Sequence, residues 1–160
     1  MSKDIVNSLM ANYTRINGLF EKFIETCPQD IWAGKIGGFP VWQQVYHTYA
    51  CFDFFLSGKG QSPLLKPLYP QEVVMFANIP DTPAEKDEIT GFVKAANLYM
   101  EKFSAALDDQ ALSDLNEGFS ARRQLPCTNA GTISSVIGHM FYHFGQCDAA
   151  LRDHGLKGLL

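Results

Sequence analysis

The sequence predicts an all-α protein, a four-helix bundle whose helices are joined by long crossover connections. Four stretches carry apolar residues at steps of three and four, the spacing that places them on one face of a helix. Two stretches between them are rich in proline, glycine and polar residues, which favour connections. The apolar–polar alternation typical of strands is missing. At 160 residues the chain suits one domain, residues 1–160.

The first helix is predicted from Ser2 to about Thr26, and Pro28 closes the run. The glycine-rich segment 27–38 is predicted to be a loop. Pro40 then opens the next helix at a first-turn position. The apolar face of the first helix consists of Ile5, Leu9, Tyr13, Ile16, Phe20 and Phe23.

The second helix is predicted for about Val41 to Leu56 and is apolar on nearly every side. A helix of this kind is buried on several sides. We therefore expect His47, in its middle, to point into protein and not into bulk water. Either the face that carries His47 or the opposite face is a candidate contact with a second subunit.

A long connection follows, from Ser57 to Asp81. Its prolines forbid a long regular helix, although a short helical turn around Gln71 to Phe76 fits the pattern. Long connections in compact domains often cover a functional site, so this segment is a candidate lid. The prolines are Pro63, Pro67, Pro70 and Pro80.

The third helix has the strongest sequence signals. The stretch TPAE, Thr82 to Glu85, predicts an N-cap, a first-turn proline and a capping glutamate. The apolar pattern then continues to Leu107. Residues 108–131 are polar and turn-rich, which predicts a second connection.

The fourth helix is predicted for about Thr132 to His154, with Thr128 or Thr132 as its cap. Gly155 is expected to end it. His154 stands in the last turn, where a positive side chain suits the helix dipole, so we interpret it as structural.

The charge pattern excludes several classes of protein. The formal net charge is −4, and the 13 lysines and arginines are scattered along the chain, which argues against nucleic-acid and acidic-lipid binding. No apolar run reaches the roughly 18 residues of a membrane span, and the start lacks a signal peptide, so we expect a soluble cytoplasmic protein. The cysteines form no CxxC pair and are predicted to be buried, inert thiols: Cys27, Cys51, Cys127 and Cys147.

Two histidines lie one turn apart in the stretch GHMFYHFGQC, residues 138–147. His139 and His143 project about 40° apart from one edge of the helix, a spacing that allows both rings to reach one metal ion. His47 also has apolar neighbours, a poor environment for an unpaired imidazole. A divalent ion shared by all three would satisfy them and leave a coordination position open, as in catalytic sites. The alternative is that the histidines are ordinary core residues.

Two stretches resemble the DinB-like and YfiT-like metalloprotein superfamily of bacterial four-helix bundles. PVWQQVYHTYACFDFFL is similar to the first ligand segment of that family, and GHMFYHFGQCDAALRDHG is similar to its last helix. The resemblance places His47, His139 and His143 on the three metal-ligand positions. Gly145 and Gln146 match the pair that follows them. Phe144 departs from the pattern, since arginine or histidine is frequent there.

The resemblance implies an up-up-down-down bundle with long crossovers, a homodimer, and bound nickel or zinc. It also implies a thiol-dependent reaction, because characterised relatives resemble transferases and isomerases that use bacillithiol, mycothiol or glutathione. It implies no DNA polymerase activity, in agreement with the acidic charge.

Three functions stay open on the sequence. The first is a metal-dependent thiol S-transferase or hydrolase acting on a small molecule, in which the metal lowers the pKa of a thiol or water. The second is a non-catalytic metal-binding or stress-response module that works as a dimer through the aromatic second helix. The third is a plain bundle with packed histidines.

Other polar residues near the histidines are weaker candidates, and no catalytic residue is assigned. Metal-bound imidazoles need orienting hydrogen bonds, which Tyr46, Tyr142 and Gln146 could provide. Arg122 and Arg123 could attract the carboxylates of an acidic thiol. Asp53 and Asp148 lie on the same helices as the histidines, but their spacing does not direct them to the ion.

Overall fold

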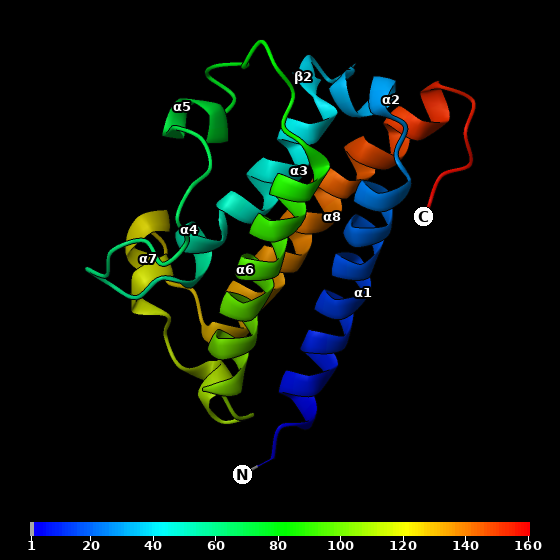
Figure 1. The fold of residues 1–160 in the computed structure, drawn as a ribbon. Coiled ribbons are helices and arrows are strands. Elements are labelled where there is room, and N and C mark those ends of the chain that lie inside the picture. Colours follow the sequence, from blue (N-terminus) through cyan, green and yellow to red (C-terminus); the bar gives the residue numbers. More distant parts are fainter. Residues whose placement is uncertain (1) are drawn as a thin grey trace.

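Four long helices form a bundle in the computed structural model, which describes residues 2–160 (Figure 1). The second of them is interrupted at Cys51, so that α3 ends at Ala50 and α4 continues from Phe52. The prediction of an all-α four-helix bundle is confirmed. The bundle helices are α1 (Asp4–Thr26), α3 (Val41–Ala50) with α4 (Phe52–Leu56), α6 (Lys86–Ala105) and α8 (Asn129–Asp153).

The four bundle helices do not run in the up-up-down-down directions that were expected. Figure 1 shows α1 and α8 running one way and α3 and α6 the other, which makes the bundle up-down-down-up. Two contacts fix α1 antiparallel to α6: Lys86 at the start of α6 donates to the carbonyl of Cys27, and the Asp109 carboxylate, just past α6, accepts from the Asp4 N–H. The up-up-down-down prediction is wrong.

The reason for the different order lies in the first connection. It contains α2 (Gln29–Ala33) and a hairpin of two short strands, β1 (Lys35–Ile36) and β2 (Phe39–Pro40), each two residues long. The turn residues Gly37 and Gly38 have φ of 60° and 90°, values that glycine adopts freely. The chain reverses in this connection, so α3 runs antiparallel to α1 and packs against α6 and α8. A true crossover therefore occurs once, between α4 and α6.

Several short elements lie where the sequence predicted loops. The long crossover contains α5 (Gln71–Val74), close to the predicted turn, and the later connection contains η1 (Ala111–Ser113) and α7 (Glu117–Arg123). The Asn116 side chain caps α7 by accepting from the Phe119 N–H at 2.9 Å. Elements this short depend on such caps and on packing rather than on apolar periodicity.

The helix ends test the capping predictions. Thr128 caps α8, since its Oγ1 accepts from the Gly131 N–H at 3.1 Å. Gly155, with φ of 74°, follows the last turn and its N–H donates to Arg152. The predicted capping box before α6 is wrong, because α6 begins at Lys86 and no side chain caps its N-terminus.

The core runs along the contacts of α1, α3, α6 and α8. Every residue from Val41 to Tyr49 is buried by the same chain. Phe54, near the end of the predicted second helix, is 44% exposed, so contact of this helix with a second subunit stays a prediction that only its last turns could serve. None of the helices in the described part of the chain combines the length and the apolar character that a membrane crossing demands.

Candidate metal site

The three predicted histidines meet where α3 packs against α8. The ring centroids of His47 and His139 are 5.1 Å apart, and that of His143 is 4.6 Å from each of them. His139 and His143 are one turn apart on α8, and α3 crosses beside them with His47 at the same level. The predicted convergence of the rings is therefore observed.

Hydrogen bonds orient two of the rings. The Nδ1 atom of His47 lies 2.6 Å from the carbonyl oxygen of Val74, and that of His143 lies 2.7 Å from Oε1 of Gln44. A carbonyl oxygen accepts, so each Nδ1 carries the proton and each Nε2 keeps its lone pair. Metal-bound histidines are oriented by partners of this kind.

His139 is the least satisfied of the three rings. Its Nε2 lies 3.1 Å from Nε2 of His47, and its Nδ1 is buried without a hydrogen-bond partner among the described residues. Two nitrogens that bind one ion at about 2.0–2.1 Å are roughly 3 Å apart. The two Nε2 atoms thus have a separation that a shared ion allows, so His47 and His139 fit a metal.

All three rings favour the neutral form that binds metals. Burial lowers the pKa of His47 below its usual value. Burial, reinforced by the neighbouring histidines, lowers the pKa of His139 to about 4 and that of His143 to about 3. Because metal ions compete with protons for imidazole, these histidines are in the ligand form near neutral pH.

Cys51 joins this cluster, although its sequence context predicted an inert thiol. Its Sγ lies 3.7 Å from both ring nitrogens of His47. The ligand atoms of His47, Cys51 and His139 lie within 4.8 Å of one another and form a group that could hold a metal ion. Burial raises the pKa of the Cys51 thiol to about 12. The spacing of four between His47 and Cys51 was the available signal.

A cavity of about 320 Å³ opens beside the cluster. Gln71, Val74 and Met75 from α5 and its end line one wall, so the long crossover covers the site, as its length suggested. Phe76 follows with φ of 61°, a strained conformation for this residue, and its ring centroid lies 4.5 Å from that of His47. The other lining residues are His47, Ala50, Cys51, Asp53, Phe54, Phe55 and His139.

The carboxylates of Asp53 and Asp148 accept hydrogen bonds from backbone N–H groups and are not directed at the histidine cluster. The Asp53 carboxylate accepts from the N–H groups of Leu64 and Leu65. Asp148 accepts from the Arg152 side chain and from the N–H groups of the chain end.

The other polar candidates also have different roles. The Tyr46 hydroxyl accepts from the N–H of Leu68, and Arg122 donates to two backbone carbonyls. Arg123 lies over the Phe119 ring. Tyr142 is exposed. The residue that orients His143 is Gln44, one turn before His47, and not one of the predicted candidates Tyr46, Tyr142 and Gln146.

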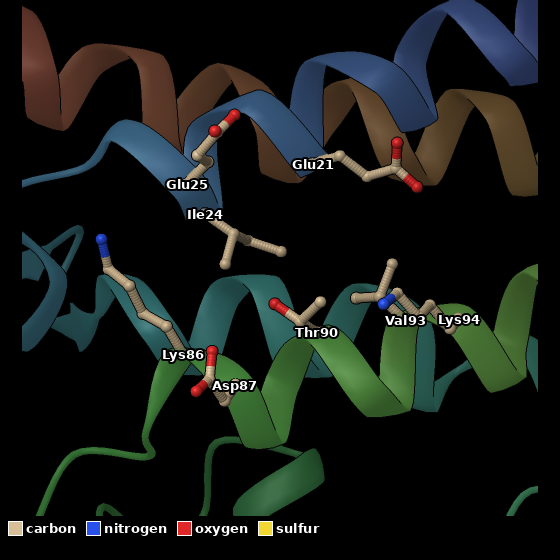
Figure 2. Close-up of a pocket in the computed structure, with 8 residues that line it drawn as sticks. All are labelled: Glu21, Ile24, Glu25, Lys86, Asp87, Thr90, Val93 and Lys94. Atoms are coloured by element: carbon tan, nitrogen blue, oxygen red, sulfur yellow. The ribbon is translucent and has the colours of Figure 1, made fainter.

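A larger cavity, about 530 Å³, lies elsewhere, in a groove between α1 and α6. Its charged rim carries both signs, and neither histidine nor cysteine lines it. Lys86 at one end is already bound to the carbonyl of Cys27 and lies 5.8 Å from the Trp32 ring centroid. The groove thus lacks the chemistry of the histidine cluster. Figure 2 shows the residues of the two helices on its opposite sides: Glu21, Ile24, Glu25, Lys86, Asp87, Thr90, Val93 and Lys94.

Comparison with known proteins supports the fold. The structure is similar to the crystal structure of a DinB-like protein from Bacillus cereus ATCC 10987, with a TM-score of 0.69 and 19% identical residues. The similarity covers 95% of this chain and 94% of that one, so the chain has a DinB-like fold over nearly its whole length. No family model and no curated protein matches the sequence.

Proposed function

We propose that the protein is a metal-dependent enzyme in which His47, His139 and His143 hold one divalent ion, nickel or zinc. The observation that carries this proposal is the orientation of the rings. His47 and His143 each use Nδ1 for a fixed hydrogen bond, which leaves the Nε2 lone pair for an ion, and His139 beside them is poorly satisfied. Imidazole nitrogen suits nickel and zinc alike.

The reaction we propose is thiol S-transfer or hydrolysis. When bound, the ion would act as a Lewis acid and lower the pKa of a thiol or water in the adjacent cavity. The protein itself does the rest: the Val74 carbonyl and the Gln44 side chain hold two of the rings in place, and α5 restricts the access of bulk water.

The cavity supports a small-molecule substrate. Its volume of about 320 Å³ lies within the range of ligand pockets, and most of its wall is apolar. Neither lysine nor arginine lines it, and Arg122 is held by the carbonyls of Phe54 and Ser57. These features favour an uncharged substrate portion near the ion over a strongly acidic one.

The alternative is a metal-binding module without turnover. Residues 41–49 are buried within the chain, so a dimer contact through the second helix would use its last turns, where Phe54 is exposed. A cytoplasmic homodimer is still our expectation.

Metal analysis tests the binding step. The protein is purified without chelator or histidine tag, loaded with nickel or zinc, dialysed and analysed by mass spectrometry of the metal. We expect one ion per chain in the parent protein and none in His139→Ala or His143→Ala, with helical circular dichroism unchanged. The matched control is His154→Ala, because this fourth histidine bonds to Ala150 at the end of α8 and should keep the ion. A parent protein that retains no ion would overturn the proposal.

A thiol panel tests the reaction. Bacillithiol, mycothiol, glutathione and cysteine are each offered with small electrophiles to the metal-loaded and metal-free protein. We expect conjugation that needs the metal and that His139→Ala abolishes. Bound metal without any conjugation or hydrolysis would favour the non-catalytic module instead.

A further inference from the structure

Cys51 lies on the cavity side of the histidine cluster. It is half-buried and lines the cavity together with His47 and His139. His143, by contrast, is buried on the other side, where Gln44 holds it. We propose that the sulfur of Cys51 is a further ligand of the ion, an inference that rests on the metal binding proposed above.

The backbone directs this thiol to the histidines. Cys51 follows His47 by one helical turn, and its N–H donates to the His47 carbonyl at 3.1 Å. Residues at this spacing lie on the same face of a helix. Cys51 is also the residue at which α3 ends and α4 begins, so the interruption of the helix occurs at the site itself.

The thiol has no strong hydrogen bond that would account for its position. Its sulfur is 3.7 Å from Nδ1 and also 3.7 Å from Nε2 of His47, so it lies beside the ring rather than in line with one lone pair. Nδ1 of His47 already donates to Val74. A thiol is a weak donor in any case, whereas a thiolate is a strong ligand for zinc.

The other cysteines show that this environment is specific to Cys51. Cys27 donates to the carbonyl of Pro28, Cys127 lies against Gly131, and Cys147 is completely buried in the core. Among the described residues, the candidate metal group includes none of these three.

A sulfur ligand changes the chemistry of the site. On binding, the thiol would release its proton to solvent and bring one negative charge to the ion. A set of nitrogens and sulfur favours zinc and cobalt over magnesium and manganese. Three imidazoles and one thiolate would fill a tetrahedral ion, so a molecule in the cavity would have to add as a fifth ligand or displace one.

Cobalt(II) is the probe that tests the sulfur directly. Metal-free protein is titrated with cobalt while its absorption is recorded, because sulfur bound to cobalt produces a charge-transfer band that nitrogen ligands lack. We expect one cobalt per chain with this band in the parent protein. Cys51→Ser and Cys51→Ala should bind cobalt without the band and with an affinity at least about tenfold lower. Cys127→Ser is the matched control and should keep both.

Three outcomes overturn the inference. Cobalt bound at one equivalent without the band in the parent protein would exclude the sulfur while leaving the histidine site intact. A band that persists in Cys51→Ser would assign the sulfur to another residue. No cobalt bound by the parent protein would contradict the metal site and the sulfur ligand together. Circular dichroism and a melting curve for each variant confirm that the comparison is made on folded protein.

Discussion

The two sides of α8 are both buried, yet they are built differently. Phe144 faces α1, where its ring centroid lies 5.1 Å from that of Phe20 in an edge-on contact. On this side the Tyr49 hydroxyl donates to Asn17 at 2.7 Å, so its polar group has a partner. The neighbouring residue, His143, faces α3, where His139 Nδ1 has no hydrogen-bond partner within residues 2–160 and a cavity opens.

This difference teaches that burial alone does not separate a stabilising face from a functional one. Phe144 is 0% exposed and His143 is 5% exposed, so both would count as core. The two sides differ in whether their buried polar atoms have hydrogen-bond partners. Native proteins pair nearly all buried polar groups, and an exception needs a reason such as an ion or a reactive site.

The largest effect should come from the aromatic side. Phe144→Ala removes a ring packed against Phe20 and Phe23 and should lower the free energy of unfolding by about 3–5 kcal/mol. Urea denaturation of the metal-free protein measures this loss. Below the new transition the folded variant should still bind one ion, since the ring does not belong to the histidine cluster. Loss of the ion from a fully folded Phe144→Ala would show that the two sides are not independent.

Local signals in the sequence predicted the two ends of α8 and the histidine side of this helix. Thr128 and Gly155 mark its ends through rules that need no neighbour, and the spacing of His139 and His143 places them together on any helix. His47 could be added because an imidazole among apolar residues calls for a partner. The resemblance to the DinB-like and YfiT-like superfamily then placed all three rings at one metal site.

The rest depended on contacts between distant segments. The direction of α3 is decided by the two-residue hairpin at Gly37 and Gly38, which is too short to leave an alternating pattern. The role of Gln44 depends on which side of α3 meets α8. The spacing of four residues placed Cys51 on the same helix face as His47, but the sequence does not reveal the packing of α5 and α8 that creates the cavity beside it.

A smaller effect, which should arise on the histidine side, is a loss of stability in acid. In metal-free protein the histidines of the unfolded chain take up protons near pH 6.5. In the folded chain the pKa is about 4 for His139 and about 3 for His143. The unfolded state therefore binds more protons between these values, and stability must fall as the pH drops from 6.5 towards 4, by up to a few kcal/mol.

Urea midpoints at pH 7.5 and pH 4.5, measured with chelator present, test this acid sensitivity. In His139→Gln the difference between the two midpoints should shrink, because one depressed pKa is gone. An unchanged difference would place the acid-sensitive groups elsewhere. The aromatic side cannot supply them, since burial raises the pKa of both Tyr13 and Tyr49 above the usual value of a tyrosine.

The smallest effects come from one hydrogen bond on each side. Gln44→Met removes the acceptor of His143 with little change in volume and should weaken zinc binding by roughly 10–100-fold. Tyr49→Phe removes the hydroxyl bonded to Asn17 and should cost about 1 kcal/mol of stability with no change in zinc affinity. Zinc competition with a coloured chelator and urea denaturation measure the two quantities in both variants.

The two variants form a crossed comparison, since each removes one polar contact from a buried position. If the polar atoms near His143 serve the ion, Gln44→Met must change affinity far more than Tyr49→Phe does. Equal changes in affinity would mean that the hydrogen bond to His143 only packs the core, as the bond to Asn17 does. Because a ring that has lost its Nδ1 acceptor can turn away from the cluster, the affinity should fall through faster release of the ion. A stopped-flow chelator chase should therefore show faster release from Gln44→Met than from Tyr49→Phe.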